Sequence, residues 1–264
     1  MILPRFDPDL AYLDRSLWLP KSRIPTRALR RLLTVQLEGD PPESILVYRE
    51  GPHHLGVPRN YVNLEEAVEQ YGVDVVDLRP RFERVHFLHS IQLRPYQEAP
   101  ARLLSTLGDG TLSLACGKGK TVLALRHMAE LSVPTLVICN NASILQGWES
   151  EIRSKMHFEG DVAWARGKKL PLDAPICLAT IQTMSERASE LPREFIRRWG
   201  LVVFDEAHHV SARVFCRAAD LFYGKRLALT ATPNRSDGLE HIYQYHLGPV
   251  FYRDTEQDLK LKLI

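Results

Sequence analysis

The chain has 264 residues, of which 45% are hydrophobic and 25% charged, and its formal net charge at pH 7 is +2. This apolar content excludes a disordered or fibrous protein, and the length suits one large domain or two modest ones. The small net charge predicts neither nucleic-acid nor membrane binding by the chain as a whole, so any basic binding surface must be local.

The cysteines and the first residues indicate a cytoplasmic protein. Cys116, Cys139, Cys177 and Cys216 are widely spaced and form no C-x-x-C pair, so we interpret them as reduced thiols. The start MILPRFDPDL is not a signal peptide, and no stretch has the apolar length of a transmembrane helix. We therefore expect no membrane partner.

Residues 1–90 contain short elements separated by proline and glycine, and we expect them to form a small α+β accessory domain. A strand is predicted over 16–24, a helix over 25–37 that runs into TVQL, and a second helix capped by Asn63 and Gly72. Four arginines crowd one short region of this domain: Arg23, Arg27, Arg30 and Arg31. Neighbouring acids favour a solvated helix face over the alternative, a patch that contacts phosphates.

From Leu93 onward, strands alternate with helices, which predicts an α/β domain with a mainly parallel sheet. A strand, the loop LACGKGKT (114–121) and a helix follow in that order. Small residues in such a loop expose N–H groups to phosphate oxygens, Lys120 adds positive charge, and the Thr121 hydroxyl can bind Mg²⁺. Leu114 stands where the pattern G-x-x-x-x-G-K-[ST] requires glycine, so an ordinary turn is the alternative for this loop alone.

The stretch LVVFDEAHH (201–209) places two carboxylates directly after four apolar residues. This pattern predicts a buried strand that delivers Asp205 and Glu206 to the edge of a sheet, where carboxylates favour a metal ion. A helix N-cap role for Asp205 is compatible with metal binding. Together with the upstream loop, the acidic pair predicts a nucleoside-triphosphate site.

These motifs resemble those of the XPB-like and type III restriction-like group of superfamily-two helicases. The matching stretches are a DEAH box (205–208), motif I (114–121), an extended motif III (227–238) and the adenine-reading motif LRPYQ (93–97). Four motifs in family order make the resemblance specific, and the family often lacks glycine at the position of Leu114.

The resemblance implies a RecA-like ATP-binding lobe over residues 91–254 with ATP and Mg²⁺ as cofactors. The residues assigned to ATP are Gln97, Gly117, Lys118, Gly119, Lys120 and Thr121. Thr121 and Asp205 would hold Mg²⁺. Glu206 would orient and deprotonate the attacking water, so the expected catalytic residues are Glu206, Lys120 and Asp205.

The resemblance also assigns residues to nucleic-acid binding and to coupling. Motifs Ia and Ib correspond to Asn140, Asn141, Ser143, Thr180 and Gln182. The short polar residues at 140–143 suit phosphate contacts and helix capping equally well. Thr230 and Thr232 would lie beside His208, on a strand between those of motifs I and II, and relay the nucleotide state; satisfied hydroxyls at a strand end are the alternative.

The expected function is an ATP-dependent DNA helicase or translocase, with DNA preferred over RNA on the family likeness alone. Residues 255–264 would begin a linker to a second RecA-like lobe, supplied in cis or in trans. Related helicases carry small N-terminal domains that contact DNA, so residues 1–90 are expected to contact DNA. If the protein is encoded by a phage, it would act in the cytoplasm of the host. Alternatives are the motor subunit of a restriction or defence complex and an ATP-binding scaffold that does not hydrolyse ATP.

Overall fold

The computed structural model describes residues 7–37, 43–106, 108–167, 169–206, 212–232 and 238–254. The chain divides into two compact units, Met1–Pro80 and Arg81–Ile264, ten residues before the division near residue 90 expected from the motifs. The intervening residues pack with the second unit because Phe87 is buried in its core and the Val85 amide donates to the Ser132 carbonyl at 2.9 Å.

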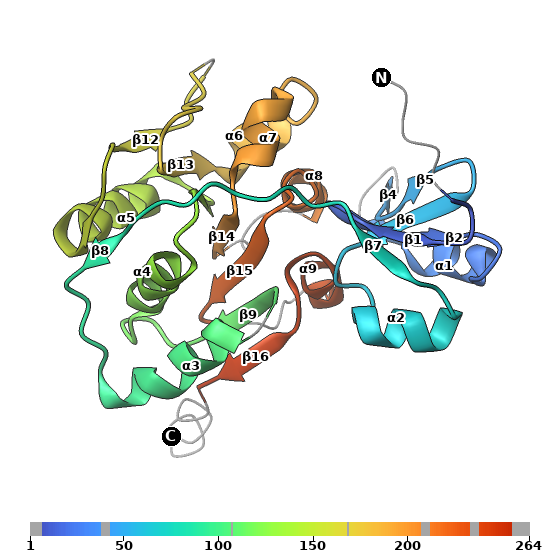
Figure 1. Cartoon of the computed structure of the whole chain (residues 1–264), viewed down its shortest axis with the longest axis horizontal. Helices are drawn as coiled ribbons and strands as arrows, with labels where there is room; N and C mark the ends of the chain where they lie inside the picture. Colours follow the sequence, from blue (N-terminus) through green and yellow to red (C-terminus); the bar gives the residue numbers. More distant parts are fainter. Residues whose placement is uncertain are drawn as a thin grey trace. The chain divides into compact units, whose positions relative to one another are not determined.

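The first unit is built on a five-stranded sheet with the order β5-β6-β2-β1-β7, in which only the β1–β7 pair is parallel (Figure 1). Its strands are β1 (Ala11–Leu13), β2 (Ser16–Pro20), β5 (Arg49–Glu50), β6 (His54–Pro58) and β7 (Val75–Asp77). A separate hairpin pairs β3 (Thr34–Leu37) with β4 (Glu43–Leu46).

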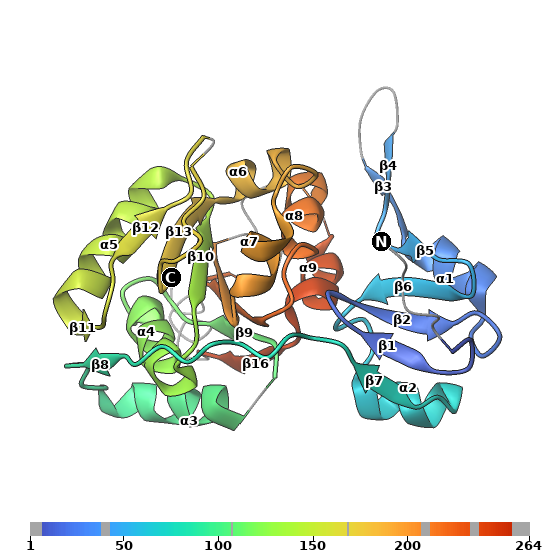
Figure 2. The ribbon, with the colours of Figure 1, turned by 45° about the horizontal axis from the view of Figure 1, so that its top comes forward.

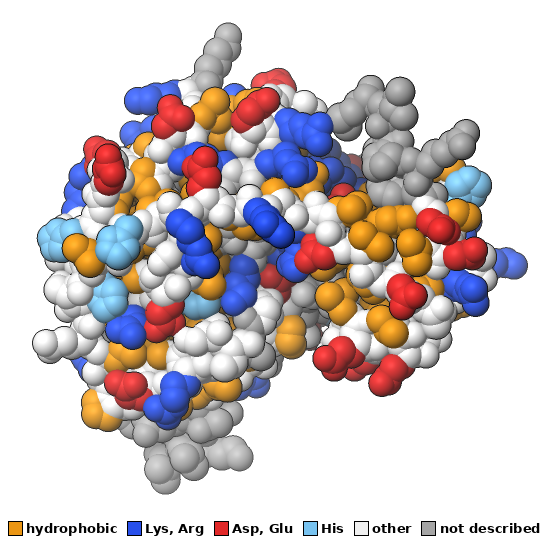
Figure 3. Space-filling view, viewed as in Figure 1, with side chains coloured by type: hydrophobic (Ala, Val, Ile, Leu, Met, Phe, Trp, Pro, Cys, Tyr) orange, Lys and Arg blue, Asp and Glu red, His pale blue; other side chains and the backbone are white. Residues whose placement is uncertain are grey.

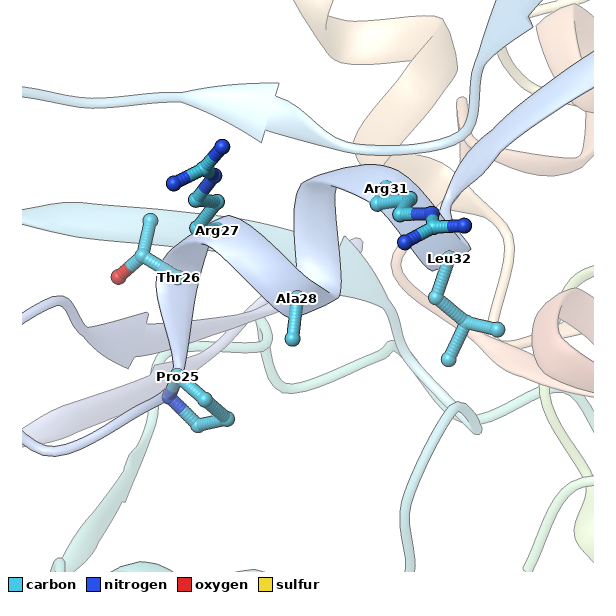
Figure 4. A pocket seen from close by; sticks show the side chains of 6 residues that line it. All are labelled: Pro25, Thr26, Arg27, Ala28, Arg31 and Leu32. Atoms are coloured by element: carbon cyan, nitrogen blue, oxygen red, sulfur yellow. The ribbon is translucent and has the colours of Figure 1, made fainter.

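Two helices complete this unit, α1 (Thr26–Leu32) and α2 (Leu64–Tyr71). The predicted caps of α2 are confirmed, since the Asn63 side chain accepts from the Glu65 amide and Gly72 has a φ of 59°. On α1, Arg30 pairs with Glu50 at 2.6 Å. Figure 4 shows a pocket along α1 lined by Pro25, Thr26, Arg27, Ala28, Arg31 and Leu32.

The second unit contains a seven-stranded sheet with the order β12-β13-β10-β14-β15-β9-β16, and every pair in it is parallel. Its strands are β9 (Gly110–Ser113), β10 (Thr135–Cys139), β12 (Val162–Trp164), β13 (Ile176–Thr180), β14 (Leu201–Asp205), β15 (Lys225–Thr230) and β16 (Val250–Arg253). The predicted α/β class is therefore confirmed, and so is the position of β15 between the strands of motifs I and II.

Helices cover both faces of this sheet, with α3 to α5 on one side and α6 to α9 on the other (Figures 1 and 2). They are α3 (Glu98–Thr106), α4 (Lys120–Leu131), α5 (Ala142–Lys155), α6 (Ile181–Glu186), α7 (Arg193–Arg198), α8 (Ala212–Ala219) and α9 (Glu240–Leu247). A 3₁₀ turn (Pro95–Gln97) precedes α3, and β8 (Leu88–His89) pairs with β11 (Met156–His157). Across the described part of the chain, every helix is too short or too polar to cross a membrane.

The central strands end level with one another. Cys139 on β10, Asp205 on β14 and Leu229 on β15 are register partners. Because the strands are parallel, the residues that follow them all emerge at the same edge of the sheet, which we call the carboxyl edge.

His127 on α4 is a buried titratable group in this unit, with 2% of its surface exposed. Burial, and secondarily the charge of Lys225, lowers the pKa of His127 from its usual 6.5 to about 4. Protonation therefore favours the unfolded chain. This unfavourable effect is absent above pH 6.5 and grows as the pH falls towards 4.

We expect acid to destabilise the protein partly through His127. Between pH 7.5 and pH 5, this group alone should lower the free energy of unfolding by about 2 kcal/mol. Urea unfolding of the wild type and of His127→Leu at both pH values measures the effect. Any loss of stability that the substitution causes equally at both pH values cancels when the two pH values are subtracted within each protein. The exposed His86→Leu is the control. If the free energy of unfolding changed equally between the two pH values in the wild type and in His127→Leu, the contribution assigned to His127 would be wrong.

Candidate functional site

The loop between β9 and α4 has the conformation that its glycines permit. Gly117 and Gly119 have φ values of 76° and 82°, in the left-handed region that favours glycine. A Cβ atom at Gly119 would overlap the amide of Gln97. The loop is joined to β15 because the Leu114 amide donates to the Thr230 carbonyl at 3.0 Å.

Gln97 joins the LRPYQ turn to this loop. Its side chain is buried, its Nε2 donates to the Lys118 carbonyl at 3.0 Å, and its Oε1 accepts from the Arg94 amide at 2.9 Å. A glutamine amide has two N–H donors and two acceptor lone pairs, so these contacts leave capacity for a base. The Lys118 side chain lies over the Tyr96 ring, with Nζ 5.1 Å from the centroid, and 4.0 Å from Asp254.

Lys120 connects the loop to the acidic strand. Its Nζ lies 3.2 Å from Oε1 of Glu206 and donates to the Leu114 carbonyl at 3.1 Å. Only 11% of the Lys120 side chain and 17% of the Glu206 side chain are exposed. Residues that are 86 positions apart in the sequence thus form a partly buried ion pair, a contact that the sequence analysis did not predict.

Asp205 is buried at the end of β14, and its Oδ2 accepts a hydrogen bond from Trp148 Nε1 at 2.8 Å. Burial raises the pKa of Asp205 to about 6, and the charge of Glu206 adds to the rise, while the Trp148 bond and Lys120 oppose it. The sequence analysis did not find Trp148. Its place on the apolar face of α5 indicates burial, but no local pattern indicates its partner.

Glu206 has a strained backbone, with a φ of 51°. For a residue other than glycine, this conformation costs roughly 1–2 kcal/mol. The backbone is held there by its amide, which donates to the Leu229 carbonyl on β15 at 3.0 Å. Strain of this kind persists where the surrounding structure imposes it and is frequent at functional sites.

The oxygen ligands at this edge fit a magnesium ion that is shared with a nucleotide. Thr121 lies in the first turn of α4 and Asp205 ends β14. No group of three or more His, Cys, Asp or Glu residues in the described ranges could hold a metal by itself. Mg²⁺ typically takes one or two protein ligands together with phosphate oxygens and water, so the donor set suits that ion.

The residues expected to contact nucleic acid follow β10 and β13 at the carboxyl edge. Asn141 caps α5 by accepting from the Ile144 amide at 3.0 Å, and its Nδ2 donates to Asn140. Thr180 caps α6 by accepting from the Thr183 amide at 3.2 Å. Ser143 and Gln182 are exposed. The capping role is thus shown for Asn141 and Thr180, and a phosphate contact remains a prediction for the whole set.

Two of the three residues expected to couple the nucleotide state, Thr230 and Thr232, lie in the described part of the chain. The Thr230 hydroxyl both donates to the Thr232 carbonyl and accepts from its amide, at 3.0 and 3.1 Å, so its local bonds are those of a satisfied strand end. Its backbone carbonyl accepts from the phosphate-loop residue Leu114. His208 lies outside the described residues.

Comparison with known proteins identifies the family. The family described as type III restriction enzyme, res subunit, matches residues 90–235. The chain is 32% identical over 174 residues to the DNA 3'-5' helicase XPB of Mycobacterium tuberculosis, covering 64% of this chain and 32% of that protein. It is 31% identical over 229 residues to the DNA 3'-5' helicase XPB of Kineococcus radiotolerans, covering 83% and 39%.

A solved structure has the same fold. The UvsW helicase from bacteriophage T4 matches with a TM-score of 0.60 at 14% identity, covering 92% of this chain and 99% of that one. The chain spans about a third of the length of the curated relatives it matches. Because the family match covers more than half of the chain, this protein belongs to the type III restriction enzyme res subunit family, in the XPB-like and type III restriction-like group of superfamily-two helicases.

Proposed function

We propose that this chain is the ATP-binding part of an ATP-dependent DNA helicase or translocase. The observation that carries the proposal is the contact of Lys120 with Glu206 beside the buried Asp205. In this proposal Lys120 is the phosphate-binding cation, Asp205 the metal-binding carboxylate and Glu206 the carboxylate that activates water. These are the parts that phosphate-loop enzymes use to hydrolyse the β–γ bond.

Each residue has a distinct role in this proposal. Lys120 and the backbone N–H groups of residues 117–121 bind the phosphates, and Gln97 reads the adenine edge. Thr121 and Asp205 hold Mg²⁺, which supplies charge neutralisation on the phosphates. Glu206 orients the attacking water and accepts its proton. Lys120 must exchange its contact with Glu206 for phosphate oxygens, and this exchange leaves Glu206 available to the water.

DNA is the proposed polymer because relatives at 31–32% identity are named DNA 3'-5' helicases or translocases. Asn140, Asn141, Ser143, Thr180 and Gln182 would lie along its backbone. A second RecA-like lobe, in cis or in trans, would complete the ATP site and close on the DNA. Nucleotide state would pass between the sites through β15 and Thr230, with Thr232 and His208 beside it.

A second candidate function is the motor of a restriction complex, which the match to a restriction-enzyme subunit favours. The ATP chemistry would be the same, and the distinguishing feature would be a nuclease or methylase partner. A scaffold that binds ATP without hydrolysis is disfavoured, because the chain retains Lys120, Asp205 and Glu206 in contact geometry.

We expect Lys120→Ala to weaken binding of Mg²⁺-ATP by roughly tenfold or more, because a hydrogen bond to a charged group contributes about 1.5–3 kcal/mol. Titration of a fluorescent ATP analogue measures the affinity. Lys155→Ala is the matched control, since Lys155 pairs with Glu151 on α5. If both variants bound as tightly as the wild type, the assignment of the loop to phosphate binding would be wrong.

We expect Glu206→Gln to bind ATP within a few-fold of the wild type but to lose turnover, because Glu206 acts on water and Lys120 on phosphate. The 264-residue chain alone should hydrolyse ATP slowly, since an arginine from a facing lobe contributes roughly 10³ to 10⁵ in turnover in related chemistry. Steady-state phosphate release with and without DNA tests both statements. Robust DNA-stimulated turnover by a monomer of this chain would contradict the second.

We expect nucleic-acid affinity to fall steeply with salt and to depend little on base sequence, because the proposed contacts are to phosphates. Fluorescence anisotropy with single-stranded DNA, duplex DNA and RNA measures this, and tighter RNA binding would redirect the proposal to that polymer. Replacing Thr180 and Gln182 together by Ala should weaken binding to all DNA sequences alike. Thr180→Ser, which keeps the cap of α6, controls for fraying of that helix.

A further inference from the structure

Two hydrogen bonds involve the residues that follow the outermost strand β12. The Lys169 amide donates to the Arg166 carbonyl at 2.9 Å, and Arg187 Nη1 donates to the carbonyl of Gly167. Gly167 has a φ of 53°, a conformation that suits glycine in a tight turn.

Arg166 in this turn is stacked on an aromatic ring. Its guanidinium carbon lies 3.8 Å from the centroid of the Trp164 ring. The indole is itself oriented, because Trp164 Nε1 donates to Oε2 of Glu149 on α5 at 2.7 Å. A stacked guanidinium keeps its N–H donors directed outward in its plane and has already lost much of its rotamer freedom.

The nearby acids are committed to other partners. Glu149 accepts from both Trp164 and Arg153, and Asp161 pairs with Arg153 at 2.8 Å. Arg166 and Lys169 are both exposed, and neither forms an ion pair with a carboxylate of the described residues. On the face shown in Figure 3, acidic and basic side chains are intermixed.

The sheet places this turn next to the residues expected to contact nucleic acid. Strands β12 and β13 are parallel with Trp164 opposite Leu178, and the Ala165 amide continues the ladder by donating to the Leu178 carbonyl at 2.9 Å. Arg166 comes two residues after Trp164, and Thr180 comes two residues after Leu178. Both therefore emerge at the carboxyl edge, on neighbouring strands.

We propose that Arg166, held by Trp164, binds a backbone phosphate of the nucleic acid, with Lys169 contributing a second cation. This contact extends the track of Thr180 and Gln182 to the outer strand of the sheet, and it rests on the proposed function. A guanidinium binds phosphate through two N–H groups, and its stacking on Trp164 reduces the entropy lost on binding.

The test compares Arg166→Gln with Arg197→Gln in the full 264-residue chain. Arg197 lies over the Tyr223 ring at 4.9 Å on α7, which precedes β14 and so lies towards the opposite edge of the sheet. Each variant removes one stacked arginine and one charge. Anisotropy with duplex and single-stranded DNA over a range of salt gives the affinity and its slope against log salt, and ATP-analogue binding checks the fold.

Arg166→Gln should lower DNA affinity roughly three- to tenfold at low salt and reduce the salt slope by about 0.9 on duplex or 0.7 on single strands. Trp164→Leu should lower the affinity with a nearly unchanged slope, because the charge remains but is no longer held. Arg197→Gln should change neither quantity.

Equal affinity and slope in Arg166→Gln and the wild type would overturn the inference and leave the proposed function intact. Equal losses in Arg166→Gln and Arg197→Gln would also overturn it, because they would reflect net charge alone. A wild-type chain that binds ATP but no nucleic acid would overturn the inference together with the proposed function.

Discussion

The parallel alignment of the seven strands is the constraint on which the candidate site depends. Because Cys139, Asp205 and Leu229 end in register, the segments after β10, β14 and β15 meet at one edge. The strand order then divides that edge. The phosphate loop and the carboxylates follow β9 and β14, on either side of β15, while the residues proposed for nucleic acid follow β10, β13 and β12. Since β10 pairs directly with β14, the two proposed sites are neighbours.

The charged groups at the centre of this edge are held at some energetic cost. Asp205 is buried enough that its pKa rises to about 6, and Glu206 occupies a left-handed backbone conformation. Trp148 and the Leu229 carbonyl fix these residues, and Lys120 offsets part of their charge. Contacts within the chain thus orient both carboxylates before any ligand binds. Electrostatic catalysis requires pre-organisation of this kind.

Much of the second unit could be predicted from the sequence, because its signals are local. The apolar run before Asp205, the glycines around Lys118 and the alternation of strands with helices each lie within a few residues. The contacts that complete the site are not local. Trp148 meets Asp205 across 57 residues, and Trp164, on which Arg166 stacks, is oriented by Glu149 on α5. The helix predicted over 25–37 was wrong in its last part, because α1 ends at Leu32 and TVQL (34–37) pairs with β4 as the strand β3, which only a partner strand reveals.

The central claim is that nucleotide phosphates replace Glu206 as the partner of Lys120. The most direct measurement is a crystal structure of the chain with Mg²⁺ and a non-hydrolysable ATP analogue. The account predicts Lys120 Nζ on the phosphate oxygens, the metal between Thr121 and Asp205, and Glu206 separated from Lys120 by more than the 3.2 Å observed here. An unchanged Lys120–Glu206 contact, with the nucleotide bound elsewhere, would contradict it.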